Sequence, residues 1–397
     1  KNEIVPRNPA FFDVNNDGWD ELFVFSNNDD SLYLSIVDVH QAKFLQKEKP
    51  LLASSPQRRG RRWDLHSVNA EFAQLEKNGP VRMLFAVNTG YARLPRCLCL
   101  YDLDQQKIIN RFDYNLSAVN FAVTDLNKDG FKEIALGSAA TNNFPSDVSL
   151  SDAFSWFVLL DHKLNYLKPP IKIGGKFTGV QVKKIENSKQ NYLVVWEKDK
   201  FTTQCWIIDS TFQVAAKRAF NLPATSLILP NDNSSTKIVI GFNNGTVNVL
   251  NTQLELLTKK EFKEVGNNFV VRKSRNIVGD DSPEYFCYSH DYLYLYDNQW
   301  QLLAYHEFPS EFNILDVYFV ARPQKSQSIV CTDKNQFFTL QLFANNLYGK
   351  IPFLFIGLLI VSFFILISGY WTFEKIRQYV FAFFFLLRES DNAIILL

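Results

Sequence analysis

Pairs of short apolar runs recur seven times along this chain, and each run has the length and residue types of a β-strand. The first runs are LFVFS (22–26), MLFAVN (83–88), EIALGS (133–138), YLVVWE (192–197), KIVIGF (237–242), YFCYSH (285–290) and SIVCTD (328–333). The second runs are LYLSIVD (32–38), RCLCLYD (96–102), SWFVLLD (155–161), QCWIIDS (204–210), GTVNVLN (245–251), YLYLYDN (292–298) and QFFTLQL (336–342). Six of the second runs end at or beside Asp or Asn, whose side chains bond the backbone of a turn.

The spacing of the pairs predicts the fold class. The repeat is about 43 to 61 residues long and contains only strands, which is the size of one four-stranded propeller blade. The runs are apolar throughout, as expected for strands buried on both faces between neighbouring blades. We therefore predict an all-β, seven-bladed β-propeller of four-stranded blades over residues 1–346. The seventh repeat lacks a last strand, and we expect Glu3 to Arg7, or residues upstream of Lys1, to close the ring.

Two loops, residues 13–21 and 125–133, share the pattern D-x-N-x-D-G-x-x-E. Oxygen ligands at alternate positions, with a glycine (Gly18 and Gly130) at the tight turn, are typical of a Ca²⁺ loop. An EF-hand is excluded because its twelfth position requires a bidentate Glu, and that position is Val24 or Leu136 here. Apolar strand-like runs flank each loop, so we place it between two strands. The alternative is an acidic turn without a metal.

Together with the strands that follow them, the two loops resemble the FG-GAP, integrin-alpha-like (VCBS-type) repeats. The resemblance implies a Ca²⁺ loop between the first two strands of the first and third blades, and it is only structural for the other five. The ligands that it implies at the first site are Asp13, Asn15, Asp17, the Trp19 carbonyl group and Glu21. At the second site they are Asp125, Asn127, Asp129, the Phe131 carbonyl group and Glu133. We expect both ions to be structural, because loops of this family mostly rigidify a hairpin.

Residues 351–371 form a run of 21 residues without a charge. As a helix this run would be about 31 Å long, the hydrocarbon thickness of a bilayer. We therefore predict one transmembrane helix over Ile351–Trp371. Lys350 is the nearby basic residue on its N-terminal side, and Lys375, Arg377 and Arg388 follow it. By the positive-inside rule, the propeller lies outside the cytoplasm, in the periplasm or at the cell surface, and the C-terminus lies inside.

The last residues indicate a signalling connection. Residues 372–390 include the apolar stretch Tyr379–Leu387, which is too short to span a bilayer. We expect this juxtamembrane segment to lie against the inner leaflet or to pair with a second subunit in a homodimer. Residues 391–397 end the stretch LRESDNAIILL, which resembles the start of a PAS domain. A start without Met and an end inside an apolar run lead us to expect a longer protein.

Composition excludes several functional classes. The formal net charge of +1 gives no basis for nucleic-acid binding. No metalloprotease, nucleophile-elbow or phosphate-loop motif is present, so we predict no catalytic or cofactor-binding residue and no enzyme activity in this chain; an output domain further along a longer protein remains open. The five cysteines lie in predicted core strands, and we interpret them as buried free thiols instead of a disulfide framework.

One basic cluster is a candidate anion-binding site. Arg58, Arg59, Arg61 and Arg62 surround a glycine between the first two repeats. Such a cluster can hold a phosphate or a lipid headgroup, and the alternative is a solvated loop.

These observations favour a sensor. We expect the propeller to bind an unknown ligand or protein outside the cytoplasm, as part of a membrane-bound signal-transduction receptor. The alternative is a cell-surface adhesion or binding protein with a single membrane anchor.

Overall fold

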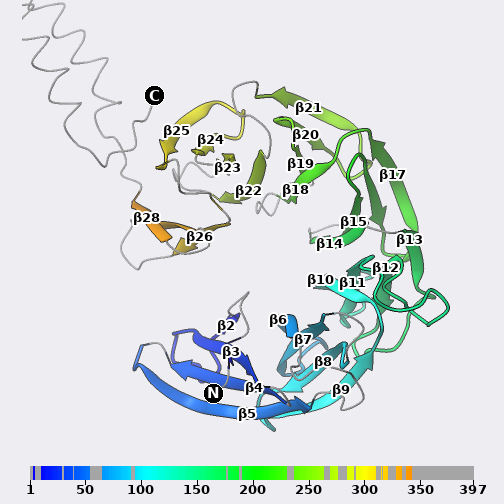
Figure 1. Ribbon diagram of the computed structural model, residues 1–397, viewed down its shortest axis with the longest axis vertical. Helices are drawn as coiled ribbons and strands as arrows, with labels where there is room; N and C mark the ends of the chain where they lie inside the picture. The colour runs from blue at the N-terminus through cyan, green and yellow to red at the C-terminus, as the bar shows by residue number, and fades with distance from the viewer. Residues whose placement is uncertain are drawn as a thin grey trace, which may run out of the picture. The chain divides into compact units, whose positions relative to one another are not determined.

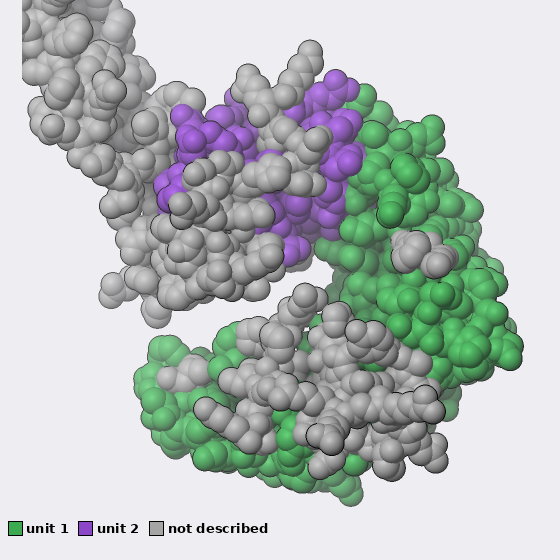
Figure 2. Space-filling model, in the orientation of Figure 1, with its two compact units in different colours: residues 1–224, 233–239, 248–259 green, residues 225–232, 240–247, 260–397 purple. Residues whose placement is uncertain are grey.

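The computed structural model describes residues 3–4, 10–28, 31–38, 40–53, 65–90, 94–175, 178–186, 190–229, 237–262, 269–275, 284–289, 292–309, 314, 316–320, 328–332 and 337–341. Every helix or strand element among these residues is a β-strand, so the all-β prediction is confirmed for this part of the chain. The chain divides into two compact units (Figure 2). The first comprises residues 1–224, 233–239 and 248–259, and the second comprises residues 225–232, 240–247 and 260–397.

The first unit contains antiparallel sheets that follow one another in chain order (Figure 1). The first sheet contains β1 (Glu3–Ile4), β2 (Ala10–Phe12), β3 (Glu21–Asn27), β4 (Ser31–Asp38) and β5 (Lys43–Ala53). The second contains β6 (Leu65–Gln74), β7 (Val81–Thr89), β8 (Cys97–Asp102) and β9 (Lys107–Asp113). Each is a meander of the kind that the repeated pairs of runs predict.

The third sheet of this unit has eight strands in two groups of four. The first group is β10 (Ser117–Thr124), β11 (Glu133–Ala139), β12 (Ser155–Leu160) and β13 (Ile171–Gly174). The second group is β14 (Gly179–Ile185), β15 (Tyr192–Lys198), β16 (Thr203–Ile208) and β17 (Val214–Phe220). One residue pair, Ala139 with Gly179, joins the two groups, so each group is otherwise a four-stranded meander.

The remaining strands form three sheets. One is β18 (Ala224–Ile228), β19 (Ile238–Phe242), β20 (Thr246–Leu250) and β21 (Leu256–Glu261), whose residues are divided between the units. Within the second unit, β22 (Val270–Arg275), β23 (Glu284–Ser289), β24 (Tyr292–Tyr296) and β25 (Leu302–Glu307) form the next sheet. The last is β26 (Asp316–Val320), β27 (Ser328–Thr332) and β28 (Phe337–Gln341).

Sheets of the first unit pack face to face, which explains the continuous apolar runs. Successive residues of a strand point to opposite faces of its sheet. On β11, Ile134 and Leu136 belong to the core shared with the second sheet, whereas Ala135 belongs to the core shared with β14 and β15. Both faces of β11 are therefore buried. The outer strands β9 and β17 are largely exposed, so their sequences are more polar.

The structure bears on the sequence predictions for the start of the chain, whereas the predicted segments at its end stay untested. Glu3 and Ile4 pair with β3 inside the first sheet, so the prediction that Glu3 to Arg7 supplies the last strand of the seventh repeat is wrong for these two residues. The alternative, a strand upstream of Lys1, stays a prediction. The predicted segments 351–371, 372–390 and 391–397 lie outside the described residues. Within the part that the structure describes, no helix is long and apolar enough to cross a membrane.

Cysteine burial agrees with the sequence. Cys97, Cys99, Cys205 and Cys287 are buried and free. The sulfur atoms of Cys97 and Cys99 lie 3.6 Å apart on one strand, as expected for residues two positions apart. All four are core residues. Burial raises the pKa of the Cys205 thiol to about 12, which leaves little thiolate for chemistry at that residue.

Candidate metal centres

The first loop joins β2 to β3 and is folded around the carboxylate of Asp13. Oδ1 of Asp13 accepts a hydrogen bond from the backbone N–H of Asp17 at 3.1 Å, and Oδ2 accepts one from Gly18 at 2.9 Å. Gly18 has a φ of 89°, which side-chain-bearing residues rarely adopt. The loop is stable because the Asp13 side chain accepts hydrogen bonds from backbone N–H groups that have no partner strand in the turn.

Glu21, the first residue of β3, binds the beginning of the loop through its carboxylate. Its carboxylate is buried, and it accepts hydrogen bonds from the Val14 N–H and from Nδ2 of Asn15, each at 2.8 Å. The same Asn15 Nδ2 lies 3.1 Å from Oδ2 of Asp17. The carboxylates of Asp17 and Glu21 therefore converge on one positively polarised group, as they would on a cation.

The second loop, between β10 and β11, repeats this arrangement. Asp125 accepts hydrogen bonds from the N–H groups of Asp129 and Gly130, each at 3.0 Å. Glu133 accepts one from Leu126 at 2.7 Å, and Nδ2 of Asn127 donates to Asp129 at 2.9 Å. The sequence match between the two loops is thus a match in geometry, and the residues predicted at each site are brought together.

An aromatic residue in each loop packs against a histidine. The rings of Trp19 and His40 stack with centroids 4.6 Å apart, and those of Phe131 and His162 lie 4.7 Å apart. Each histidine belongs to the turn after the second run of the same repeat. The aromatic side chain thereby fixes the backbone that carries the carbonyl group implied as a ligand.

The second loop is also attached to the preceding sheet. The N–H of Lys77, in the β6–β7 turn, donates to the Gly130 carbonyl at 2.7 Å, and the N–H of Lys132 donates to the Leu75 carbonyl at 2.8 Å. A Cβ atom on Gly130 would lie 3.2 Å from Cβ of Lys77. Glycine at this position is therefore needed both for its φ of 92° and for the close approach of the turn.

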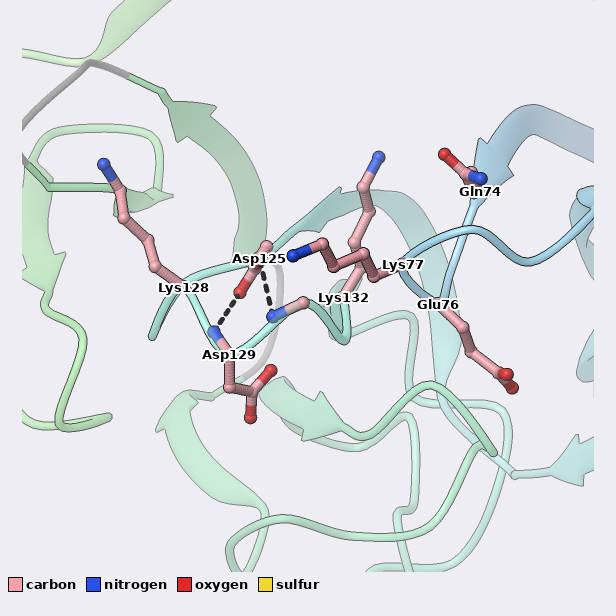
Figure 3. A pocket seen from close by; sticks show the side chains of 8 residues that line it. Gln74, Glu76, Lys77, Asp125, Lys128, Asp129 and Lys132 are labelled. Atoms are coloured by element: carbon pink, nitrogen blue, oxygen red, sulfur yellow. Dashed lines mark hydrogen bonds between the residues drawn. The ribbon is translucent and has the colours of Figure 1, made fainter.

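A pocket of about 330 Å³ lies beside the second loop (Figure 3). It is lined by Gln74, Glu76, Lys77, Asp125, Lys128, Asp129, Gly130 and Lys132. Three lysines thus bring positive charge close to two predicted ligands, whereas the first loop contains no lysine. The two loops share a pattern but differ in the charge around them.

Burial raises the pKa of Glu133 to about 7, and the nearby charge of Asp129 adds to this effect although the Leu126 N–H opposes it. Desolvation disfavours the charged carboxylate, and a second carboxylate repels it. A cation in the loop would favour the charged form. A cation bound in the second loop would therefore offset the cost of burying Glu133.

Asp38, the last residue of β4, is the acidic residue that sequence reasoning missed. One carboxylate oxygen from each of Asp17, Glu21 and Asp38 lies within 4.8 Å of the other two. Leu22 pairs with Val37, so Glu21 and Asp38 stand at the same end of the β3–β4 pair. The sequence signal was the Asp that ends the second run, which we interpreted as a turn residue only. Among the described residues, three acidic groups come this close together only here.

The first loop passes a test of fit for a hard divalent cation. Its donors are oxygens, the ligands that Ca²⁺ prefers. Asp38 is 2% exposed, and its Oδ2 has no hydrogen-bond partner. A buried carboxylate oxygen without a partner is costly, so a cation beside it would stabilise the folded state. Asp13, Asp17 and Glu21 would hold a Ca²⁺ ion here, which would link β2 to β3.

The arginine cluster at residues 58, 59, 61 and 62 lies outside the described residues, and it stays a prediction.

Comparisons with known proteins concern the fold alone. No family model matches the sequence, and no curated protein matches it. A crystal structure of BBS1N in complex with ARL6DN, soaked with mercury, is 10% identical with a TM-score of 0.52, over 85% of this chain and 91% of that chain. The lead-soaked crystal has a TM-score of 0.51 at 10% identity, over 86% and 94%.

The exotype rhamnogalacturonan lyase YesX has a TM-score of 0.51 at 13% identity, over 79% of this chain and 63% of that chain. BBS1N is a β-propeller, and the sheets described above are of that kind. This chain therefore has a β-propeller fold.

Proposed function

We propose that this chain is the extracytoplasmic sensing propeller and membrane anchor of a signal-transduction receptor, with seven FG-GAP-like blades and two structural Ca²⁺ ions. The observation that carries the proposal is a β-propeller followed in sequence by the uncharged run 351–371. A chain of this kind places a binding domain on one side of a membrane and its C-terminus on the other. The propeller binds a ligand or a protein partner, and this chain catalyses no reaction.

Signal transfer in this proposal passes through the residues after the propeller. Two copies pair through the segment 351–387, and binding to the propeller changes the packing of that pair. Residues 387–397, which resemble the start of a PAS domain, then connect the pair to an output domain in the cytoplasm. The ligand must favour one packing over the other, since only differential binding shifts such an equilibrium.

The Ca²⁺ ions have a structural role. The first loop connects β2 to β3 and the second connects β10 to β11, and the second loop is also bonded to the preceding sheet through Lys77 and Lys132. An ion at each loop holds these connections in place in a compartment where Ca²⁺ can be plentiful.

A topology measurement tests the location. The full chain is expressed with a fluorescent protein fused after Leu397, and protease is added to intact spheroplasts. We expect the fluorescence to stay protected while the propeller is digested. Digestion of the fluorescent protein, or protection of the propeller, would refute the assigned orientation.

A cell-surface adhesion protein with a single anchor is the second candidate, because a propeller is itself a binding surface. The reading frame that follows Leu397 in the gene distinguishes the two. An output domain there supports the receptor, and a stop codon supports the adhesion protein. Chemical cross-linking in membranes provides a second criterion, since the receptor requires a dimer.

A further inference from the structure

We propose that Asp38 is a ligand of the cation at the first loop, and that the two loops consequently bind Ca²⁺ with different affinities, the first more tightly. The inference rests on the proposed Ca²⁺ loops and adds to them a residue outside the repeated pattern. The first site then takes carboxylates from Asp13, Asp17, Glu21 and Asp38. The second has those of its own loop only.

The two oxygens of Asp38 have different surroundings. Oδ1 accepts a hydrogen bond from the backbone N–H of Gln41 at 2.7 Å, as a turn-forming aspartate does. Oδ2 is buried and has no partner. The turn therefore accounts for one oxygen, and the other is available to a cation beside Asp17 and Glu21.

Asp102 shows what a buried aspartate at this position needs. It ends β8 as Asp38 ends β4, and its Oδ1 accepts a hydrogen bond from the Gln105 N–H at 2.8 Å. Its Oδ2, however, lies 3.9 Å from Nε of Arg82, which is its cross-strand partner on β7. At the corresponding end of β3 the residue is Glu21, so the positive charge is replaced by a negative one. Two buried carboxylates at one strand end repel each other, and a cation between them would offset this cost.

Asp161 shows why the second loop lacks this extra ligand. Its Oδ1 accepts hydrogen bonds from the N–H groups of Lys163 and Asn165, each at 2.8 Å. Its Oδ2 accepts one from Nδ2 of Asn165 at 3.1 Å. Both oxygens thus already accept hydrogen bonds within the turn after β12, unlike Oδ2 of Asp38, which has no partner.

The charge surrounding each site reinforces the difference. Affinity at oxygen-ligand loops is tuned by the number of charged ligands and by the rigidity of the site. The first loop and Asp38 together supply four carboxylates, of which those of Asp17, Glu21 and Asp38 converge within 4.8 Å. The second loop supplies three and lies beside Lys77, Lys128 and Lys132. The first site therefore fills at the lower Ca²⁺ concentration.

Terbium luminescence tests the role of Asp38 in the full chain. Tb³⁺ substitutes for Ca²⁺, and Trp19 within the first loop sensitises its emission. We expect the wild-type chain to give tryptophan-excited emission that Ca²⁺ displaces and that Asp17→Ala abolishes. Asp38→Asn, which keeps the Gln41 hydrogen bond, should weaken Ca²⁺ competition at least about tenfold. Asp161→Asn is the matched control and should leave the titration unchanged.

The outcomes separate the two proposals. If Asp38→Asn titrates like the wild type while Asp17→Ala abolishes the emission, the assignment of Asp38 is wrong and the Ca²⁺ loop stands. Emission that survives Asp17→Ala, or no emission from the wild type, overturns the loop and the assignment together.

Thermal unfolding keeps the test valid if Asp38→Asn alters folding. Without Ca²⁺, removing one of two facing carboxylates should leave Tm unchanged or raise it. The rise in Tm on adding Ca²⁺ should be smaller than in the wild type. A lower Tm without Ca²⁺ together with an undiminished Ca²⁺-induced rise would show that Asp38 only forms the turn, and it would refute the proposal.

Discussion

At the scale of single residues, the ion pair of Arg96 and Asp152 is the most buried charge interaction among the described residues. Nη1 of Arg96 lies 2.9 Å from Oδ2 of Asp152, and both side chains are almost fully buried. Removing one partner of such a pair leaves an uncompensated charge. We expect Asp152→Ala to lower the free energy of unfolding by about 3–5 kcal/mol in urea titrations. The exposed pair Arg111–Asp113 is the control, and Asp113→Ala should cost less than about 1 kcal/mol.

The same carboxyl group predicts a pH dependence. Burial alone would raise the pKa of Asp152, but hydrogen bonds from the Phe144 N–H, the Thr141 hydroxyl and Arg96 outweigh it and hold the pKa below the ordinary 3.8. The unfolded chain therefore takes up its proton first as pH falls. The stability advantage of wild type over Asp152→Asn should be constant above about pH 5 and shrink progressively as pH falls below that value. An advantage that shrinks toward neutral pH would contradict this assignment.

The two loop glycines differ in what surrounds them. Gly18 and Gly130 both have positive φ, but a Cβ atom on Gly130 would also meet Lys77, whereas one on Gly18 would meet nothing within 4 Å. We expect Gly18→Ala to cost about 1–2 kcal/mol and Gly130→Ala to cost more. Equal urea midpoints for the two variants would show that the contact with Lys77 does not fix the second loop.

At the scale of elements, a polar residue of an inner strand connects the two four-stranded groups of the third sheet. Asn120 on β10 donates from Nδ2 to the Val182 carbonyl of β14 at 2.6 Å, and its Oδ1 accepts from the Val182 N–H at 3.0 Å. Asn120→Ala leaves both buried backbone groups unpaired, which should cost about 1–3 kcal/mol in urea unfolding. The exposed Asn165→Ala should change stability by about 0.5 kcal/mol or less. A similar small effect at Asn120 would mean that this link does not hold the two four-stranded groups together.

These links also explain which strands the sequence could predict. β11 and β15 face two apolar neighbours, so their runs are uniformly apolar and recognisable. The inner strands β10 and β14 carry Asn120, Gln181 and Lys183, which obscure any simple period. The role of Asn120 can be recognised only when the neighbouring four-stranded group is known, because its hydrogen bonds pass from one group to the other.

The candidate sites were predictable from the sequence only in part. Residues 13–21 and 125–133 each hold their ligand pattern within one contiguous loop, so the pattern is visible in the sequence. Asp38 reaches the first site through the register of β3 with β4. That register depends on the length of the hairpin turn. Lys77, which lies beside the second loop, comes from another sheet and was equally hidden, whereas Lys128 and Lys132 belong to the loop itself.

At the scale of the whole molecule, the repeat of strand pairs predicted the propeller fold but not the place of its first residues. Hydrophobic periodicity specifies which residues a strand buries, whereas the pairing of the short β1 depends on which sheet edge it meets. Both calcium-type loops lie in the first unit, and the D-x-N-x-D-G pattern occurs nowhere else in the chain. The metal-dependent part of the stability should therefore belong to that unit.

Calorimetric titration of the full chain with Ca²⁺ tests the central claim that both loops are cation sites of the propeller. We expect two binding events, the tighter lost in Asp17→Ala and the weaker lost in Asp129→Ala, with the fold retained in both variants by circular dichroism. The absence of any Ca²⁺ heat that these substitutions remove would contradict the account and would reduce both loops to acidic turns.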